Sequence, residues 1–442
     1  MRTLAAVAAA LAIPLLLPHS PPDAARRARS RRYELRGGWW LADSTFVRRR
    51  MFVVDDLLTT RRPAVVDSVI ELGDRYVVPP FADAHTHLLT NPASARAESD
   101  RLLADGIFGV LSLTGSAAGR HAAAGRVNVP DAVDVAYADA LTSTRGHPIL
   151  SAEVSANRIP WDSLQKYWPT LLHSHRAEGD VYFTIDSLAD LERKWPRLRA
   201  NVPDLVKIYL FDSEHFDSLS RDTTSIGTRG LDPALVPAIV ARAHRDSLRV
   251  AAHVETAADF RIAVRAGVDI VAHLPGLAPR ADEPAARYQL TAADAADARR
   301  AGTAVVLTAW LAERLAAPKP WLGSAGADIA QLRRAQQIQR ASIAELQRVG
   351  VPMAIGSDLF GTAITEALYL EHLGTFDRRT LLHMLVATTP HLVFPTRHVG
   401  RLVPGDEASL LVLGCNPLQR LECVRTPSFR MKQGVVLRAT ST

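Results

Sequence analysis

Short runs of apolar residues alternate with polar turns over residues 33–78. Phe52-Val53-Val54 and Val69-Ile70-Glu71-Leu72 are typical of these runs. Apolar runs of this length, bounded by turn residues, are the usual sign of β-strands. We therefore expect residues 33–78 to form short antiparallel strands.

The pattern changes after residue 79. Residues 233–246 and 257–266 have the spacing of amphipathic helices, whereas residues 250–253 and 270–273 begin with short apolar runs. Strands that alternate with helices favour a parallel sheet, and about 310 residues of this pattern suit a (β/α)8 barrel. Strand-like runs return in the tail, at residues 409–413 and 434–437.

These patterns predict an α/β protein with two folded parts. A TIM-like (β/α)8 barrel covers residues 80–394. Residues 33–79 and 395–442 pair with each other as a small β-sandwich domain. Residues 1–32 stand apart as a leader segment.

Composition supports a globular protein, and charge excludes one class of partner. The chain has 442 residues, of which 48% are hydrophobic and 22% charged, and its net charge is +6. Residues 1–32 contain six arginines and one aspartate, which leaves 46 basic and 45 acidic residues for the rest of the chain. The body is nearly neutral and carries no nucleic-acid-binding motif, so we expect no nucleic-acid partner.

The leader has the pattern of an export signal. Arg2 precedes the apolar residues 4–17, and prolines follow at positions 18, 21 and 22. A membrane-spanning helix needs about 20 apolar residues, so this run predicts no stable membrane span. We expect a periplasmic or secreted protein. The alternative is a cytoplasmic protein in which this segment is an N-terminal arm.

The only two cysteines, Cys415 and Cys423, exclude a disulfide scaffold and a cysteine-built zinc site. They form either one disulfide in an oxidising compartment or two buried free thiols.

Polar side chains follow the apolar runs of the predicted barrel, where such folds place their functional groups. Two of these side chains, His85 and His87, are two residues apart and therefore lie on one side of an extended segment. Together the set supplies enough ligands for a two-metal hydrolytic site. Its members are His85, His87, Lys207, His253, His273 and Asp358.

Lys207 is unusual in this sequence. The chain has five lysines against 47 arginines, and Lys207 lies within the apolar run 205–210. Burial favours a neutral amine, which can add carbon dioxide to become a carbamate whose two oxygens bridge two cations. A salt-bridged or solvent-reaching lysine is the alternative.

The order His-x-His, Lys, His, His, Asp resembles the amidohydrolase superfamily, in particular its binuclear branch with a carboxylated lysine. That branch includes imidazolonepropionase-like hydrolases and prolidase-type dipeptidases. Residues 253–256 (His-Val-Glu-Thr), 266–273, 387–390 and 400–406 are also typical of it. The resemblance covers nearly the whole chain after the leader.

The resemblance implies a specific site. His85, His87 and Asp358 would hold one metal ion, and His253 and His273 the other. Carbamylated Lys207 would bridge both ions together with a hydroxide. Zinc is the expected metal, and Asp358 is expected to act as the proton shuttle.

Substrate contacts are predicted at two positions. His147 resembles the Gly-His loop of the dipeptidase-like relatives. Tyr209 shares a face with Lys207 if the strand alternates. Structural polar groups are the alternative for both.

Residues 153–180 match no pattern of the family. This segment contains Trp161 and a second His-x-His pair, His173 and His175. We expect the aromatic residues to belong to a lid or partner surface, and the histidine pair not to bind metal.

The predicted function is hydrolysis of a C–N amide bond in a small molecule, either dipeptide-like or a cyclic amide. A lactone or ester hydrolase and a deaminase are alternatives on the same scaffold, and Lys207 argues against the deaminase. A non-catalytic binding protein is a third hypothesis. A homo-oligomer is compatible with the sequence.

Overall fold

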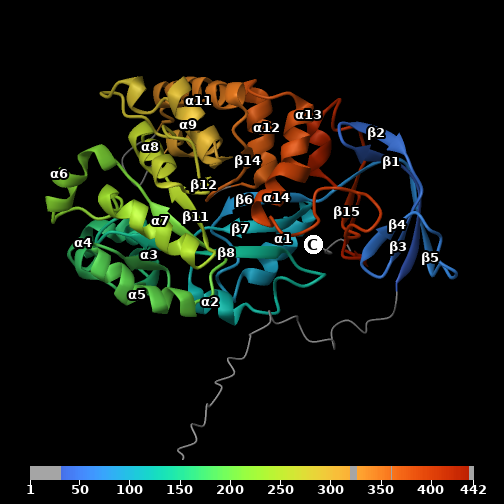
Figure 1. Cartoon of the computed structure of the whole chain (residues 1–442), viewed down its shortest axis with the longest axis horizontal. Coiled ribbons are helices and arrows are strands. Elements are labelled where there is room, and N and C mark those ends of the chain that lie inside the picture. The colour runs from blue at the N-terminus through green and yellow to red at the C-terminus, as the bar shows by residue number, and fades with distance from the viewer. Residues whose placement is uncertain (1–30, 319–325, 360, 438–442) are drawn as a thin grey trace, which may run out of the picture.

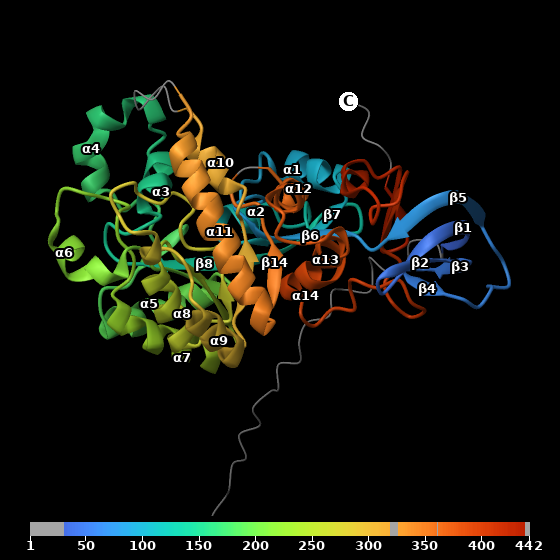
Figure 2. The ribbon, with the colours of Figure 1, turned by 90° about the horizontal axis from the view of Figure 1, so that it is seen from above.

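The computed structural model describes residues 31–318, 326–359 and 361–437. The predicted leader lies outside the described residues except for its last two positions, and Arg32 already begins the first strand. Within these ranges, no helix combines the length and the apolar character that crossing a bilayer requires. Figures 1 and 2 show two bodies side by side, a large α/β part and a smaller β part.

A parallel barrel forms the large part. Its strands are hydrogen-bonded in the order β14-β13-β12-β11-β10-β8-β7-β6, and a bridge between Thr86 and Asp358 joins its two ends. A further short strand, β9 (Tyr182–Thr184), pairs with β8 outside this ring. The barrel strands are β6 (Phe81–Thr86), β7 (Ile107–Ser112), β8 (Asp134–Thr142), β10 (Leu205–Tyr209), β11 (Arg249–His253), β12 (Ile270–Val271), β13 (Ala304–Leu307) and β14 (Met353–Ile355).

Helices surround the barrel, as expected for strands buried on both faces. Capping boxes at Thr256 and Thr291 start two of them, and glycines with positive φ, Gly267 and Gly302, end the same two. The helices are α1 (Ala95–Ala104), α2 (Ala117–Ala122), α3 (Ile149–Ala156), α4 (Leu164–His173), α5 (Leu188–Ala200), α6 (Phe216–Arg221), α7 (Val236–Arg245), α8 (Ala257–Ala266), α9 (Ala292–Ala301), α10 (Leu311–Ala316), α11 (Ile329–Val349), α12 (Ala363–Leu373), α13 (Arg378–His383) and α14 (Thr389–Val393).

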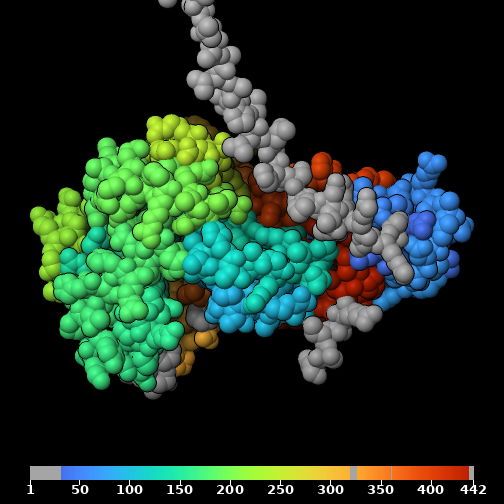
Figure 3. Space-filling model, turned by 90° about the horizontal axis from the view of Figure 1, so that it is seen from below, coloured from blue at the N-terminus to red at the C-terminus, as the bar shows by residue number. Residues whose placement is uncertain are grey.

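The small β part combines both ends of the described chain, which confirms the predicted barrel with a separate sandwich domain. Val77 of β5 pairs with Val412 of β15, so the N-terminal and C-terminal segments share one sheet. In Figure 3 this part lies at one end of an elongated molecule. Its strands are β1 (Arg32–Ala42), β2 (Thr45–Arg48), β3 (Met51–Val54), β4 (Leu57–Thr59), β5 (Ser68–Val78), β15 (Leu410–Leu413), β16 (Phe429–Lys432) and β17 (Val435–Val436).

One expectation for this sheet is wrong. Residues 33–78 were expected to be antiparallel throughout, but β1 and β5 are parallel neighbours over most of their length. The hairpin of β3 and β4 lies between them in sequence and pairs on the outer side of β1, so β5 runs in the same direction as β1. Apolar alternation reports which residues are buried and carries no information on strand direction.

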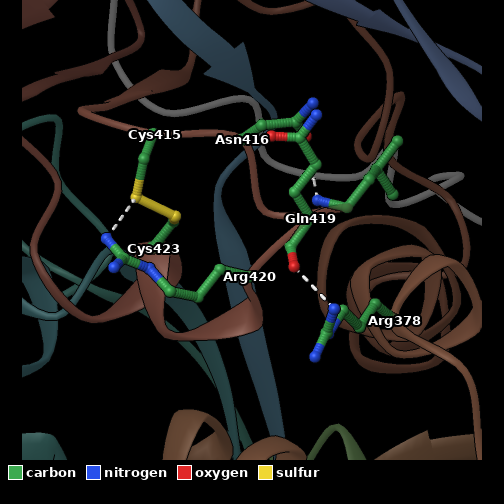
Figure 4. The surroundings of a disulfide bond; sticks show 7 residues. Arg378, Cys415, Asn416, Gln419, Arg420 and Cys423 are labelled. Atoms are coloured by element: carbon green, nitrogen blue, oxygen red, sulfur yellow. Dashed lines mark hydrogen bonds between the residues drawn. A yellow bond between two sulfur atoms is a disulfide. The ribbon is translucent and has the colours of Figure 1, made fainter.

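The two cysteines form a disulfide, which resolves the alternative left by the sequence. Cys415 and Cys423 are joined in the loop that follows β15 (Figure 4). Arg420 donates a hydrogen bond to Cys415 Sγ, and Arg378 of α13 donates one to the Gln419 carbonyl. The disulfide therefore closes a loop that is attached to the barrel helices.

Candidate functional site

The predicted ligands meet at one end of the barrel. Three of them, His85, His273 and Asp358, place their ligand atoms within 4.8 Å of one another. His85 is in β6, while Asp358 and His273 follow the short strands β14 and β12. Their convergence follows from the closed ring, because the parallel strands deliver their carboxyl ends to the same mouth.

Two histidines point the same nitrogen at Asp358. Nε2 of His87 lies 3.0 Å, and Nε2 of His85 3.6 Å, from Oδ1 of Asp358. Nδ1 of His85 lies 2.6 Å from the Ala272 carbonyl oxygen, and Nδ1 of His87 lies 3.3 Å from that of Thr114. A carbonyl can only accept, so the His85 ring carries its proton on Nδ1 and leaves Nε2 free, which is the arrangement of metal-binding histidines. In His87 both ring nitrogens face acceptors, the Thr114 carbonyl and the Asp358 carboxylate.

His253 and His273 complete a continuous group of rings. Their centroids are 4.3 Å apart with the rings edge to face, and His273 stacks on His85 at 5.4 Å. Nδ1 of His273 is buried and finds no hydrogen-bond partner in the part of the chain that the structure describes. A buried nitrogen left unpaired is unfavourable, and a metal ion would satisfy it.

Lys207 lies inside β10, deeper than the strand end at which it was expected. It pairs in register with Ala251, whereas Tyr209 is level with His253. Its side chain is 0% exposed, and Nζ has no hydrogen-bond partner among the described residues. Burial lowers the pKa of Lys207 to about 7, so a large share of the amine is neutral near that pH. The salt-bridged and solvent-reaching alternatives do not fit this position.

The imidazoles are in the form that binds metal. Burial lowers the pKa of His273 to about 3, and it also holds the pKa values of His85 and His253 well below the usual 6.5. Burial alone raises the pKa of Asp358, but the nearby rings of His85 and His87 outweigh it and hold that pKa below its usual range. Neutral imidazoles beside an ionised carboxylate match the ligand chemistry of a divalent cation.

Both predicted substrate residues line the same cavity as these ligands. The ring of His147 stacks on His253 at 4.6 Å, and burial lowers the pKa of His147 to about 4. The Tyr209 hydroxyl is hydrogen-bonded to Thr114 Oγ1.

Glu255 is a site residue that the sequence reasoning did not single out. Its Oε1 lies 3.0 Å from Nε2 of His253, and it lines the cavity. Burial, with smaller contributions from Asp259, Asp212 and Asp358, raises the pKa of Glu255 to about 8. The spacing could have identified it, because positions i and i+2 of an extended segment share one side.

The cavity above the ligands has a volume of about 910 Å³. Besides the ligand-bearing strands, its walls come from the loops after β6, β7, β8, β12, β13 and β14. Cavities of this size accommodate drug-sized ligands.

Part of the wall comes from residues 153–180, which matched no family pattern. The buried carboxylate of Glu153 in α3 holds this segment together. It accepts five hydrogen bonds, which come from Asn157, Ser174, Arg176, Ala177 and Tyr182.

His173 and His175 do not join the metal-ligand group. His173 ends α4, and His175 is exposed with Nδ1 3.8 Å from Oε2 of Glu178. Trp161, in the same segment, lines the cavity and is 55% exposed.

Comparison with known proteins supports the fold. No protein-family model and no curated protein matches the sequence. A solved A. niger ochratoxinase matches with a TM-score of 0.69 at 17% identity, over 94% of this chain and 97% of that chain. A prolidase solved with N-methylphosphonate-L-proline matches with a TM-score of 0.66 at 19% identity, over 92% and 99% of the two chains. An amidohydrolase matches with a TM-score of 0.66 at 20% identity, over 93% and 100%. The resemblance to the amidohydrolase superfamily is therefore confirmed at the level of the fold.

Proposed function

We propose that this protein is a metal-dependent hydrolase that cleaves a C–N amide bond in a small molecule. One observation carries the proposal. A buried amine without a partner, at Lys207, lies in the same cavity as neutral imidazoles and an ionised carboxylate. An amidohydrolase, a prolidase and an ochratoxinase share the fold and support this choice of reaction.

The residues fit two divalent ions, and their nitrogen and oxygen ligands favour zinc. His85, His87 and Asp358 would hold one ion, and His253 and His273 the other. His273 is also close to the first set, because its ligand atom lies within 4.8 Å of those of His85 and Asp358. When bound, such ions lower the pKa of a coordinated water and polarise the scissile carbonyl.

Lys207 would contribute as a carbamate. Its neutral amine would add carbon dioxide and release a proton, and the resulting anion would have two oxygens with which to help hold the ions. The modification would convert the amine, which has no hydrogen-bond partner among the described residues, into an anionic group whose oxygens cations can satisfy.

Asp358 would move the proton. Its carboxylate stays ionised, and one of its oxygens lies 3.0 Å from Nε2 of His87. We assign to it the acceptance of a proton from the attacking water and its delivery to the leaving nitrogen.

Tyr209 and His147 would hold the substrate. Burial raises the pKa of Tyr209 above its usual value, so its hydroxyl keeps its proton and can donate to a carbonyl or carboxylate oxygen. His147 lies on the same wall, stacked on His253.

We also propose that the protein is exported. The Cys415–Cys423 disulfide supports this location, because disulfides persist in oxidising compartments.

The test is hydrolysis by the zinc-loaded protein of a panel of dipeptides, cyclic amides and lactones. The proposal expects turnover of at least one amide that is lost in Asp358→Asn. If the protein hydrolyses lactones but none of the amides, its function is ester hydrolysis and the proposal of amide hydrolysis is wrong.

A further inference from the structure

The walls of the 910 Å³ cavity differ in chemistry from one side to the other. Besides the metal ligands, the described residues of the loops after β12, β13 and β14 that line the cavity are all leucines. Every lining hydroxyl and amide, and the only lining arginine, come from the loops after β6, β7 and β8 or from β10. Apart from the metal ligands and Glu255, the polar side chains among the described lining residues therefore lie on one side of the mouth, where apolar residues also occur.

The order of strands places these two walls opposite each other. In the closed ring of eight, β8 is the third strand and β13 the seventh when counted from β6. Strands four positions apart in a ring of eight face each other across the axis. In Figure 1, α4 and α11 accordingly lie on different sides of the barrel.

The apolar wall consists of Leu277, Leu311, Leu315 and Leu359. Leu359 lies at the rim and is 61% exposed, whereas Leu277 and Leu311 are buried. An exposed leucine that continues a buried apolar surface favours an apolar ligand group laid along it, because removing methylene groups from water is favourable.

The polar wall presents the guanidinium of Arg176, and its one lining carboxylate, Asp180, accepts hydrogen bonds from Ser116 and the Ala118 amide. Among the described residues, no carboxylate forms an ion pair with Arg176, and the nearby Glu178 pairs with Lys194 instead. Small and aromatic residues, including Ala152, Ala156 and Trp161, flank it on this wall. A guanidinium left open beside a cavity is suited to a carboxylate, which it can bind through two parallel hydrogen bonds.

The backbone of Arg176 is anchored although its side chain is exposed. Its amide donates to Oε2 of Glu153 at 3.1 Å, and the Ala177 amide donates to Oε1 at 3.0 Å. Glu153 is fully buried. The buried Glu153 carboxylate therefore holds the backbone that carries Arg176, which makes Glu153 a positioning residue.

We propose that the substrate is an amide that joins a long apolar group to a carboxylate-bearing group, with Arg176 receiving the carboxylate and the leucine wall receiving the apolar group. The inference rests on the proposed function and names its substrate class. The scissile bond would then lie between the two walls, above His85, His273 and Asp358.

Four probes test this with the zinc-loaded protein. They are N-octanoyl-L-phenylalanine, its carboxamide, N-acetyl-L-phenylalanine and the reversed amide N-octylsuccinamic acid. We expect one of the two octyl-chain acids to exceed both the carboxamide and the acetyl compound at least tenfold in kcat/KM. The preferred acid tells which side of the amide bears the carboxylate. Equal rates for acid and carboxamide would overturn the inference.

Two variants locate the effect. Arg176→Gln should lower the acid-to-carboxamide ratio of kcat/KM at least tenfold, mainly through KM. Arg158→Gln, which removes an exposed arginine of the same segment outside the cavity, should leave the ratio unchanged. Leu315→Asn should lower the octanoyl-to-acetyl ratio at least fivefold. Unchanged ratios in both cavity variants would contradict the assignment.

A binding measurement separates this inference from the proposed function. Calorimetry with N-octanoyl-D-phenylalanine should show binding that Arg176→Gln weakens at least tenfold. Such binding without hydrolysis of any amide would leave the cavity assignment standing and refute the hydrolase. Rapid hydrolysis of acetylated or cyclic amides, with no effect of Arg176→Gln, would support the proposed hydrolase and refute the assignment of the cavity walls.

Discussion

Oδ1 of Asp358 lies 3.0 Å from Nε2 of His87, although the two residues come from opposite ends of the barrel sequence. They meet because β6 and β14 close the ring, where the bridge between Thr86 and Asp358 forms and the Asp358 amide donates to the His85 carbonyl at 2.7 Å. Asp358 has a positive φ of 58°, a conformation that aspartate tolerates better than most residues. The site therefore depends on closure of the barrel.

Replacing Lys207 by methionine separates its chemistry from its packing. The change keeps the shape of the stem and removes the unpaired buried amine. We expect the metal-free protein to gain about 1–3 kcal/mol in free energy of unfolding, the usual penalty of such a group. Bridged metal binding and amide hydrolysis should be lost. Urea unfolding in a chelator and metal analysis measure the two effects, and wild-type turnover with two ions bound would contradict the role of Lys207.

Glu153→Gln should destabilise the protein in a pH-dependent way. Burial raises the pKa of Glu153, but hydrogen bonds from Ser174, Tyr182 and the backbone amides of Ala177 and Arg176 outweigh it and lower that pKa below the usual 4.5. The ionised carboxylate therefore stabilises the fold above pH 4.5, and this contribution disappears as the pH falls through the folded pKa.

At pH 7 the variant should lose about 1–3 kcal/mol, because a glutamine amide leaves at least one buried donor unpaired. Chemical unfolding of both proteins at pH 7 and pH 3 checks this. Glu192→Gln, an exposed carboxyl of α5, is the control. A stability difference that stays constant down to pH 3 would argue against an ionised Glu153.

Gly356→Ala should disturb the metal site through packing alone. An added Cβ would lie 2.6 Å from Val306 Cγ1 and 2.7 Å from His85 Cβ, closer than carbon atoms approach. Val306, His85 or the Gly356 backbone must shift, and a displaced His85 should weaken metal binding at the proposed site about 10- to 100-fold. Zinc titration against a competing chelator measures the change. Gly414→Ala, where a Cβ meets nothing within 4 Å, should bind zinc like the wild type.

Removing the disulfide should lower stability without altering the site. Linking cysteines eight positions apart contributes about 2–3 kcal/mol in the chain-entropy account. The double variant Cys415→Ser/Cys423→Ser should therefore melt lower than the wild type and keep its kcat/KM. A reducing agent should lower the Tm of the wild type to that of the variant. A reducing agent that leaves the wild-type Tm unchanged would show that the bond does not form.

The sequence predicted the part of the site that depends on strand ends. Each proposed ligand is in or just after an apolar run, and parallel strands of one ring bring such positions together, as they do for His85, His273 and Asp358. Lys207 was found for the same reason, although it lies deeper in β10 than expected.

Other features depend on contacts that no local pattern encodes. The parallel pairing of β1 with β5 follows from where the β3–β4 hairpin docks. The five hydrogen bonds of Glu153 join residues up to 29 positions away, so residues 153–180 could not be placed from sequence. Arg176 and the leucine wall face each other only because the ring of eight strands closes, so their arrangement could not be predicted from any local pattern.

The most direct test of the central claim is a zinc titration of the metal-free protein in bicarbonate buffer, followed at once by metal stoichiometry and by amide hydrolysis. The account predicts that hydrolysis is absent without metal and rises to a plateau at two zinc ions per chain. It predicts no such rise in Lys207→Met. Full hydrolysis in metal-free protein, or a plateau of activity that Lys207→Met also reaches, would contradict it.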